Sequence, residues 1–208
     1  MRKPKLRELG EAIRAIVKGP YTTKFPKVPS IPPKGFRGVI VYNEERCIGC
    51  GACVEVCPAK ARAIEDDIQR KVRKVIHYQE KCIYCGQCVN YCTTQEGIKH
   101  TQDYDLAKIK NEGYENIIEK ELAFCEICGD VVAPKAQLLW IAHKVGELAF
   151  ANPTLYLTLY KDLGIISEEP NSSLLATRYS DLPYRSQHQR ILCVDCRRKT
   201  YLNEIWGY

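Results

Sequence analysis

Several features that would mark an enzyme or a membrane-spanning protein are missing from these 208 residues. No run approaches the roughly 18–20 apolar residues that cross a bilayer, which argues against a transmembrane helix. No glycine-rich phosphate loop, dinucleotide fingerprint or nucleophile–base motif occurs, so no substrate site is visible. The first residues lead into charge rather than an apolar stretch. We therefore expect no secretory signal and a reducing compartment.

Cysteine, in contrast, is abundant, with twelve in the chain. Eight of them form two runs of identical C-x2-C-x2-C-x3-C spacing, which begin at Cys47 and Cys82. This is the bacterial ferredoxin spacing for a [4Fe-4S] cluster. Three thiolates on such a tight loop reach three corners of a cubane, and the loop directs backbone N–H groups at the sulfurs. Free or disulfide-paired thiols would not account for eight matching positions.

The two runs also predict how the ligands are shared. In two-cluster ferredoxins the fourth cysteine of each run binds the other cluster. Such crossing would hold the clusters close together, which suits electron transfer between them. The predicted ligands are Cys47, Cys50, Cys53 and Cys92 for the first cluster, and Cys82, Cys85, Cys88 and Cys57 for the second.

A second kind of metal site is predicted in the C-terminal half. Cys125 and Cys128 form one C-x2-C pair, and Cys193 and Cys196 form another. Two such turns can supply four thiolates to one tetrahedral ion. We favour structural zinc, which binds soft thiolates and needs no redox partner. A rubredoxin-like iron, a third cluster and a disulfide stay open as alternatives. Four protein ligands leave no position for a substrate. We therefore expect the ion to hold the C-terminal segment together rather than to catalyse a reaction.

Histidine and the last basic residues offer weaker signals. His77, His100, His143 and His188 occur singly, and a lone histidine is usually structural or exposed. We therefore expect none of them to bind a metal. The basic run 197–199 follows the last cysteine and is interpreted as a solvated cap.

The middle of the chain is an internal repeat with an offset of 35 residues. It predicts an α+β fold for residues 38–102, a pseudo-symmetric (βαβ)2 bacterial-type ferredoxin domain. Each cysteine run is preceded by a β-branched stretch, ends in a short helix and is followed by a second strand. The predicted strands are 39–42, 63–65, 72–78 and 97–99, and the helices begin at 54 and 89.

The segment before the repeat differs in charge and composition. Residues 1–37 carry ten Lys or Arg and two Glu, a net charge of +8, whereas the remainder carries −2. Apolar residues at helical spacing predict an amphipathic helix over 5–18. Five prolines between residues 20 and 33 predict an extended stretch. We interpret these features as a partner-binding arm with an anionic partner. A loose linker and a solvated basic face stay open as alternatives.

The segment after the repeat, residues 103–208, is expected to be a helical extension closed by the four-cysteine metal site. Polar residues 103–122 are interpreted as a helix. A broad apolar face predicts a second helix over 135–150. Pro153 is expected to begin a third, which runs to Leu163. The stretch 174–182 is expected to be irregular.

Several motifs resemble those of a known family. The first part of the chain resembles the two-cluster subunit of complex I. The later part is more similar to the ferredoxin-like subunit of formate hydrogenlyase. Related membrane-bound hydrogenases and archaeal sulfane reductases share that ancestry. The motifs are Phe36-Arg37-Gly38, Glu45-Arg46-Cys47-Ile48-Gly49-Cys50, Lys81-Cys82-Ile83-Tyr84-Cys85-Gly86, Tyr104-Asp105-Leu106, Phe124-Cys125-Glu126-Ile127-Cys128 and Cys193-Val194-Asp195-Cys196. One departure is Thr93, where the family usually has proline.

The resemblance implies an electron-transfer subunit without catalytic residues, peripheral on the cytoplasmic face of a membrane. Electrons would enter from ferredoxin or a donor subunit and cross two [4Fe-4S] clusters. They would leave to a cluster-bearing small subunit that feeds a [NiFe] or related site in a catalytic large subunit.

Two alternatives come from other classes. The first is a free soluble two-cluster ferredoxin-like carrier with a structural zinc tail, which would need no anchoring arm. The second is a nucleic-acid-binding protein. The chain lacks interleaved aromatic and basic residues, so we expect no nucleic-acid partner.

Overall fold

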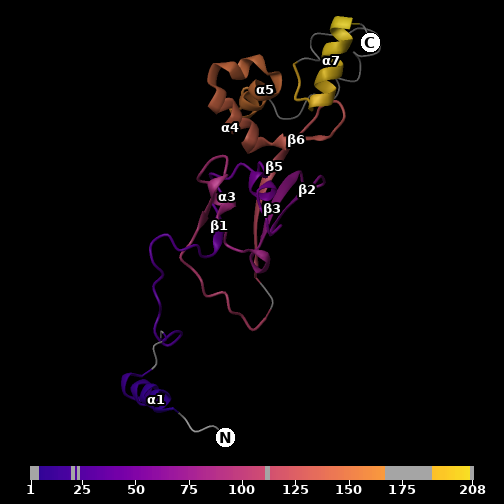
Figure 1. Cartoon of the computed structure of the whole chain (residues 1–208). Coiled ribbons are helices and arrows are strands. Elements are labelled where there is room, and N and C mark those ends of the chain that lie inside the picture. The colour runs from indigo at the N-terminus through magenta and orange to yellow at the C-terminus, as the bar shows by residue number, and fades with distance from the viewer. Residues whose placement is uncertain (1–4, 20–21, 23, 111–112, 167–188, 207–208) are drawn as a thin grey trace. The chain divides into compact units, whose positions relative to one another are not determined.

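The computed structural model describes residues 5–19, 22, 24–110, 113–166 and 189–206 (Figure 1). The stretch 174–182, which is expected to be irregular, and His188 lie outside these residues. The chain divides into two compact units, residues 1–36 and 37–208, which are considered separately. Within the described part of the chain, no helix is both long and apolar enough to traverse a bilayer.

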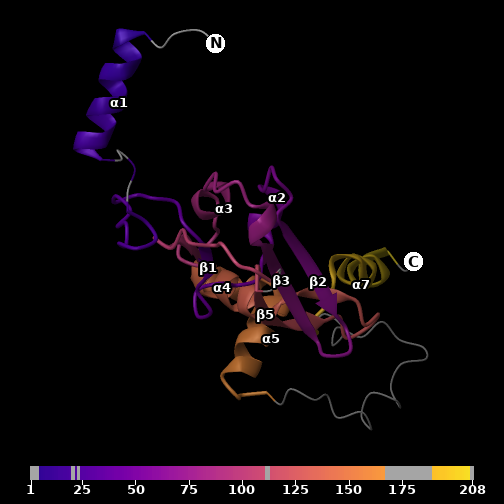
Figure 2. The same ribbon diagram turned by 90° about the horizontal axis from the view of Figure 1, so that it is seen from below.

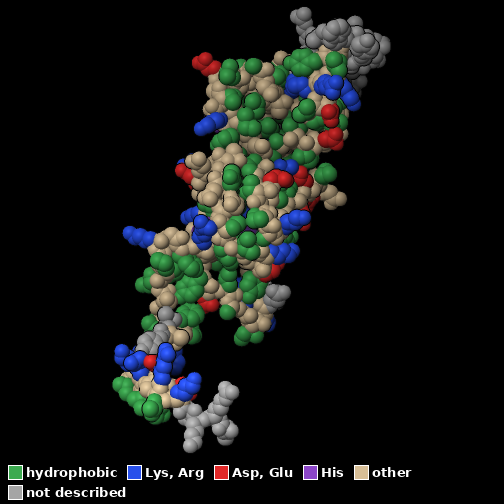
Figure 3. All heavy atoms as spheres, in the orientation of Figure 1, with side chains coloured by type: hydrophobic (Ala, Val, Ile, Leu, Met, Phe, Trp, Pro, Cys, Tyr) green, Lys and Arg blue, Asp and Glu red, His purple; other side chains and the backbone are tan. Residues whose placement is uncertain are grey.

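The first unit contains one helix, α1 (Leu6–Lys18), as predicted. The Lys5 backbone N–H donates to the Glu8 carboxylate at 3.1 Å and closes the first turn. The helix ends at Gly19, whose φ of 74° is costly for other residues. None of its residues is buried. Figure 3 shows the apolar side chains of α1 gathered apart from its Lys and Arg side chains.

The second unit begins with the ferredoxin-like strands. β1 (Ile40–Tyr42) pairs antiparallel with β4 (Ile98–His100), and β2 (Arg62–Asp67) pairs antiparallel with β3 (Val72–Tyr78). The short helices α2 (Ala52–Glu55) and α3 (Gln87–Asn90) lie between the strands in sequence and side by side in space (Figure 2). The order is therefore β1-α2-β2 followed by β3-α3-β4, and the predicted α+β ferredoxin-like fold is confirmed.

The backbone repeats along with the sequence. Left-handed φ angles recur at three positions of each half, 35 residues apart. One such residue directly precedes each short helix and turns the chain into it. Because the left-handed region is costly for most residues, this recurrence shows that both halves follow the same path. The pairs are Gly49 and Tyr84, Gly51 and Gly86, and Lys60 and Gln95.

The polar segment after the repeat is a strand, so the predicted helix over 103–122 was wrong. β5 (Glu115–Phe124) pairs antiparallel with β3, and Val75 faces Ile118. Without β5, that edge of β3 would leave a row of backbone groups unpaired. Ile118 and Leu122 are buried, with 6% and 2% of their surface exposed. Tertiary pairing has thus overridden local propensity.

The sheet continues into the C-terminal half. β6 (Val131–Pro134) pairs with β5, which gives a four-stranded order β2-β3-β5-β6. Beyond β6, the described residues form two α-helices with a 3₁₀ segment between them, and a further helix in the tail. In Figure 1 these helices lie together at the end of the sheet where β5 passes into β6. They are α4 (Lys135–Val145), η2 (Gly146–Ala151), α5 (Pro153–Asp162) and α7 (Val194–Trp206).

Two of these helices follow the sequence expectations closely. α4 ends at Val145, earlier than the predicted helix over 135–150, and the 3₁₀ segment η2 follows it directly. α5 begins at Pro153 as predicted, and the Asn152 side chain accepts a hydrogen bond from the Thr154 N–H at 3.0 Å. The helix α7 was not predicted.

Candidate metal centres

The two cysteine runs wrap around the short helices of the ferredoxin-like half. All twelve cysteines are among the described residues, and none is disulfide-bonded there. Cys53 lies on α2 and Cys88 on α3, and the other cysteines of the runs flank these helices. Both runs contribute to one small core, because Cys53, Cys82 and Cys92 pack against the buried cluster formed by Ile40, Cys88 and Ile98.

The end of each run lies beside the start of the other. The Thr93 hydroxyl, next to Cys92, is 3.2 Å from the Cys50 sulfur of the first run. Conversely, Cys57 of the first run joins three cysteines of the second in the lining of one cavity. The sulfur-bearing residues of that cavity are Cys57, Cys82, Cys85 and Cys88. Four thiols from two runs facing one cavity are the donor set that a [4Fe-4S] cluster requires.

Several N–H groups are directed at the sulfurs of these runs. The Ala61 N–H donates to Cys57 Sγ at 3.3 Å, and the Tyr84 N–H donates to Cys82 Sγ at 3.4 Å. Such bonds favour the negatively charged state of the sulfur and, with it, a reduced cluster.

Burial of the thiols in the two cysteine runs has the opposite effect, because it favours the neutral, protonated thiol. It raises the pKa of Cys53 to about 11, although the nearby Arg62 guanidinium lowers it. Burial likewise raises the pKa of Cys47 and Cys88. Without a metal these groups are therefore neutral thiols at pH 7, and cluster assembly must displace their protons.

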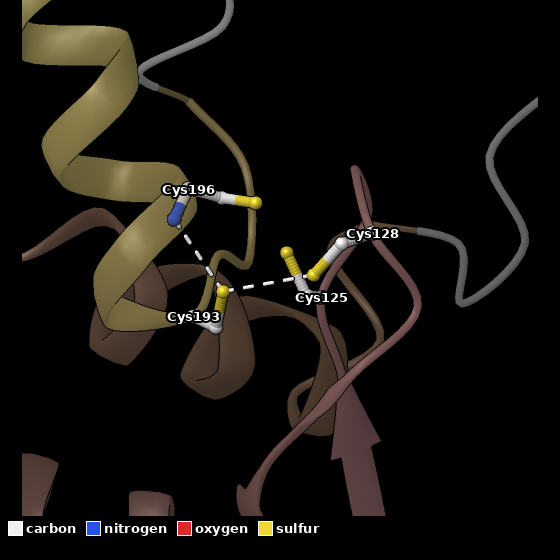
Figure 4. A group of neighbouring side chains, drawn as sticks. All are labelled: Cys125, Cys128, Cys193 and Cys196. Atoms are coloured by element: carbon white, nitrogen blue, oxygen red, sulfur yellow. Dashed lines mark hydrogen bonds between the residues drawn. The ribbon is translucent and has the colours of Figure 1, made fainter.

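The four remaining cysteines converge on a single point (Figure 4). Cys125 and Cys128 lie on the turn between β5 and β6, whereas Cys193 directly precedes α7 and Cys196 lies in its first turn. Their four Sγ atoms lie within 4.8 Å of one another, and those of Cys128 and Cys193 are 3.7 Å apart.

This spacing fits one metal ion. Four thiolates bound at about 2.3 Å to one tetrahedral ion stand about 3.8 Å from one another. A cubane spreads its four thiolates over four separate irons, which requires wider spacing. In the part of the chain that the structure describes, no three of the other eight cysteines converge as closely. The geometry therefore favours a mononuclear ion over a third cluster.

The sulfur of Cys125 is already prepared to bind a metal. Burial disfavours its thiolate, but backbone N–H groups of Cys128, Cys193 and Ile127 outweigh burial and lower the pKa of Cys125 to about 6. This group is therefore largely ionised at pH 7.

Hydrogen bonds hold the two cysteine pairs of this site together. The Glu126 N–H donates to the Ile191 carbonyl at 2.9 Å. Arg197 donates to the Arg190 carbonyl at 2.7 Å and to the hydroxyl of buried Thr154 on α5 at 2.8 Å. The interpretation of 197–199 as a solvated cap was therefore wrong for Arg197, because this side chain ties α7 to α5.

The described histidines lie outside the four-cysteine group. His77 is 1% exposed, and its Nδ1 donates to the Ala61 carbonyl at 3.1 Å. Burial and the nearby Arg62 lower the pKa of His77 to about 4, so it is neutral at pH 7. His100 similarly donates to the Gly38 carbonyl, and His143 is exposed.

Sequence reasoning missed two residues at the ferredoxin-like site. The Arg62 guanidinium lies 3.6 Å from Cys88 Sγ, and the Thr93 hydroxyl lies beside Cys50. The only sequence signal for Thr93 is that it replaces the expected proline. Arg62 begins a strand and carries no local signal.

The chain is similar to iron–sulfur proteins over its ferredoxin-like half and, over a longer stretch, to one family of them. Residues 33–96 match the 4Fe-4S dicluster domain, so the chain is an iron–sulfur protein with two [4Fe-4S] clusters. Formate hydrogenlyase subunit 6 of Escherichia coli (strain K12) is 35% identical over 127 residues, which cover 61% of this chain and 70% of that protein. The chain belongs to this family of iron–sulfur electron-transfer subunits.

Two further similarities are more distant. NAD(P)H-quinone oxidoreductase subunit I of Picosynechococcus sp. is 32% identical over 132 residues, which cover 61% of this chain and 65% of that subunit. The predicted resemblance to a complex-I-related two-cluster subunit is thus confirmed. A chain in the solved structure of the membrane-bound sulfane sulfur reductase, an archaeal respiratory membrane complex, matches with 22% identity and a TM-score of 0.41. That match covers 64% of this chain and 85% of the other.

The geometry of the four-cysteine site predicts the effect of breaking it. Cys193→Ser removes one of four ligands and should raise protease cleavage within residues 125–196 at least about tenfold, since local closure then loses more than about 1.4 kcal/mol. The visible spectrum of the two clusters should not change. Limited proteolysis with mass spectrometry measures both. The control is Val194→Ser, at a neighbouring side chain that is 85% exposed. Equal cleavage of the two variants would contradict a stapling role.

Proposed function

We propose that this chain relays electrons as a non-catalytic, peripheral subunit on the cytoplasmic face of a complex-I-like membrane-bound oxidoreductase. A donor such as ferredoxin supplies electrons, which cross the two [4Fe-4S] clusters to a cluster-bearing small subunit. That subunit passes them to a catalytic large subunit of hydrogenase, sulfane reductase or formate hydrogenlyase type. The interleaving of the two cysteine runs around one core carries the proposal, because it places two cluster sites side by side.

The same interleaving supports the crossed ligand sets. Thr93 lies beside Cys50, which supports the neighbouring Cys92 as the fourth ligand of the first set. The cavity that Cys57 shares with three cysteines of the second run supports Cys57 as the fourth ligand of the other set. The sets are Cys47, Cys50, Cys53 and Cys92, and Cys82, Cys85, Cys88 and Cys57.

Crossed ligation is tested by replacing one fourth cysteine at a time. Cys57→Ser should damage the cluster of the second run and leave that of the first, because serine is a poorer ligand than thiolate for iron–sulfur clusters. Cys92→Ser should do the reverse. EPR spectra of the reduced proteins distinguish the two clusters. Loss of the first cluster alone in Cys57→Ser would show that the ligands are not crossed.

The N-terminal unit supplies a docking element for the complex. Leu6, Ile16 and Val17 on α1 are 79–89% exposed, so the apolar face of the helix lacks cover within the described chain. A helix of this length is marginal alone in water. Its apolar face and the net charge of +8 over residues 1–37 suit an anionic partner surface. A free carrier needs no such element.

Deleting residues 1–34 tests this assignment and the subunit role together. Both clusters should keep their spectra, because the cysteines lie outside the deletion, while co-purification with membranes should fall at least about tenfold. The full-length chain, purified in parallel, is the control. If the truncated chain co-purifies in full yield, the arm does not anchor it. If the full-length chain itself never associates with membranes, the chain is a free carrier.

We infer that the ion at Cys125, Cys128, Cys193 and Cys196 is structural zinc. The site lies outside the ferredoxin repeat, so the electron path does not require it. It joins the β5–β6 turn to the start of α7, segments that are distant in sequence, and a redox-silent ion suits that role.

Elemental analysis of the purified chain tests the identity of this ion. We expect about eight iron and one zinc per chain, from two cubanes and one tetrahedral ion. Cys193→Ser should lose the zinc and keep the iron, whereas Val194→Ser should keep both. Nine iron without zinc would indicate a mononuclear iron site, and twelve iron would indicate a third cluster.

A further inference from the structure

Arg62 places a buried positive charge between the two cysteine runs. It begins β2 and is only 5% exposed. Its Nη1 donates to the Tyr42 hydroxyl at 2.6 Å, and its Nη2 lies 3.6 Å from Cys88 Sγ, within hydrogen-bond distance for sulfur. It also lies close enough to Cys53 for its positive charge to lower the pKa of that thiol, against the larger effect of burial. The guanidinium therefore contacts Cys88, the third cysteine of the second run, and lies near Cys53, the third cysteine of the first, which shares its core group with Cys88 and Tyr42.

Arg62 has no carboxylate partner among the described residues. Other arginines of the same hairpin do: Arg70 pairs with Glu119 at 2.8 Å. An unpaired buried charge costs several kcal/mol, so burial of this guanidinium requires a nearby anion. Burial raises the pKa of Tyr42, so its hydroxyl stays neutral and supplies no charge. The negative charge must therefore come from the sulfur ligands.

The arrangement is not repeated in the other half of the pseudo-symmetric domain. The residue 35 positions beyond Arg62 is Gly97. A Cβ there would lie 2.9 Å from the Thr94 hydroxyl and 3.1 Å from the Cys47 Cα, so the site has no room for a second long side chain. Arg62 therefore has no counterpart at the matching position of the other half.

We propose that Arg62 is a shared electrostatic bridge that sets the reduction potentials of both clusters. The proposal rests on the crossed ligand sets above. When one electron enters a cluster, the core is reduced and the net negative charge of that cluster grows by one unit, with no bond made or broken and no proton transferred. The guanidinium stabilises that extra charge on either cluster. Because it lies near both cluster sites, its charge raises both reduction potentials.

The test compares two replacements of Arg62 by EPR-monitored redox titration of the isolated chain. Arg62→Gln removes the charge. At a fixed applied potential, the ratio of reduced to oxidised cluster should fall at least tenfold for both clusters. For a one-electron couple this corresponds to a reduction potential that is lower by about 59 mV. Arg62→Lys keeps the charge and should lower the ratio less than threefold.

Two controls separate charge from packing and proximity. Arg70→Gln removes an exposed arginine of the same hairpin that pairs with Glu119, and should change neither potential. Thr93→Val removes only the hydroxyl beside Cys50, and should lower the potential of the first cluster alone. A shift of both clusters in Arg62→Gln but of one in Thr93→Val would be the signature of a shared charge.

The proposal is overturned if Arg62→Gln holds both clusters at unchanged potentials, or if only one potential moves. If Arg62→Gln does not assemble its clusters, the Arg62→Lys variant decides between a role in setting potentials and a role in folding. Assembled clusters with ratios within threefold of the original support the proposal. Loss of clusters or a larger shift would make Arg62 a folding residue. These potentials belong to the isolated chain, so failure of membrane association would not affect the result, and the Cys57→Ser spectra test the ligand sets separately.

Discussion

Binding of sulfur to metal is the interaction on which the ferredoxin-like half depends. Its core cluster contains only three buried residues, Ile40, Cys88 and Ile98, and three of the five side chains packed around them are also cysteines. The sheet formed by β1 and β4 has only three residues in each strand, too few for stability alone. Metal–thiolate bonds must therefore supply much of the folding free energy. The cysteines that would bind the clusters are thus also part of this core.

Features encoded locally could be predicted from the sequence, and features decided by distant contacts could not. The cysteine spacing, the apolar repeat of α1 and the proline at the start of α5 each act within a few residues. The two-cluster domain, the amphipathic helix and the start of α5 were therefore predicted correctly. β5 was taken for a helix because its Glu and Lys residues are compatible with either state. Its pairing with β3, about forty residues earlier in the chain, decides the matter.

The same division applies to the metal sites. The two C-x2-C pairs identified the four cysteines of the tail, but only the 4.8 Å limit on their sulfur separations favours one ion over a cluster. Arg62 and Thr93 carry no ligand motif. Their partners Cys88 and Cys50 lie 26 and 43 residues away in sequence, so only the folded chain reveals the contacts.

β5 connects the two kinds of metal site physically. The Asn116 side chain donates to the Ile40 carbonyl at 3.2 Å, and the Lys120 ammonium donates to the Glu44 carbonyl ahead of the first cysteine run. The strand then ends directly before Cys125. A ten-residue strand paired on both sides is rigid, so it can fix the tail relative to the clusters without carrying electrons. An ion without redox chemistry at its end would preserve that geometry as electrons pass, because its charge and its bond lengths stay constant.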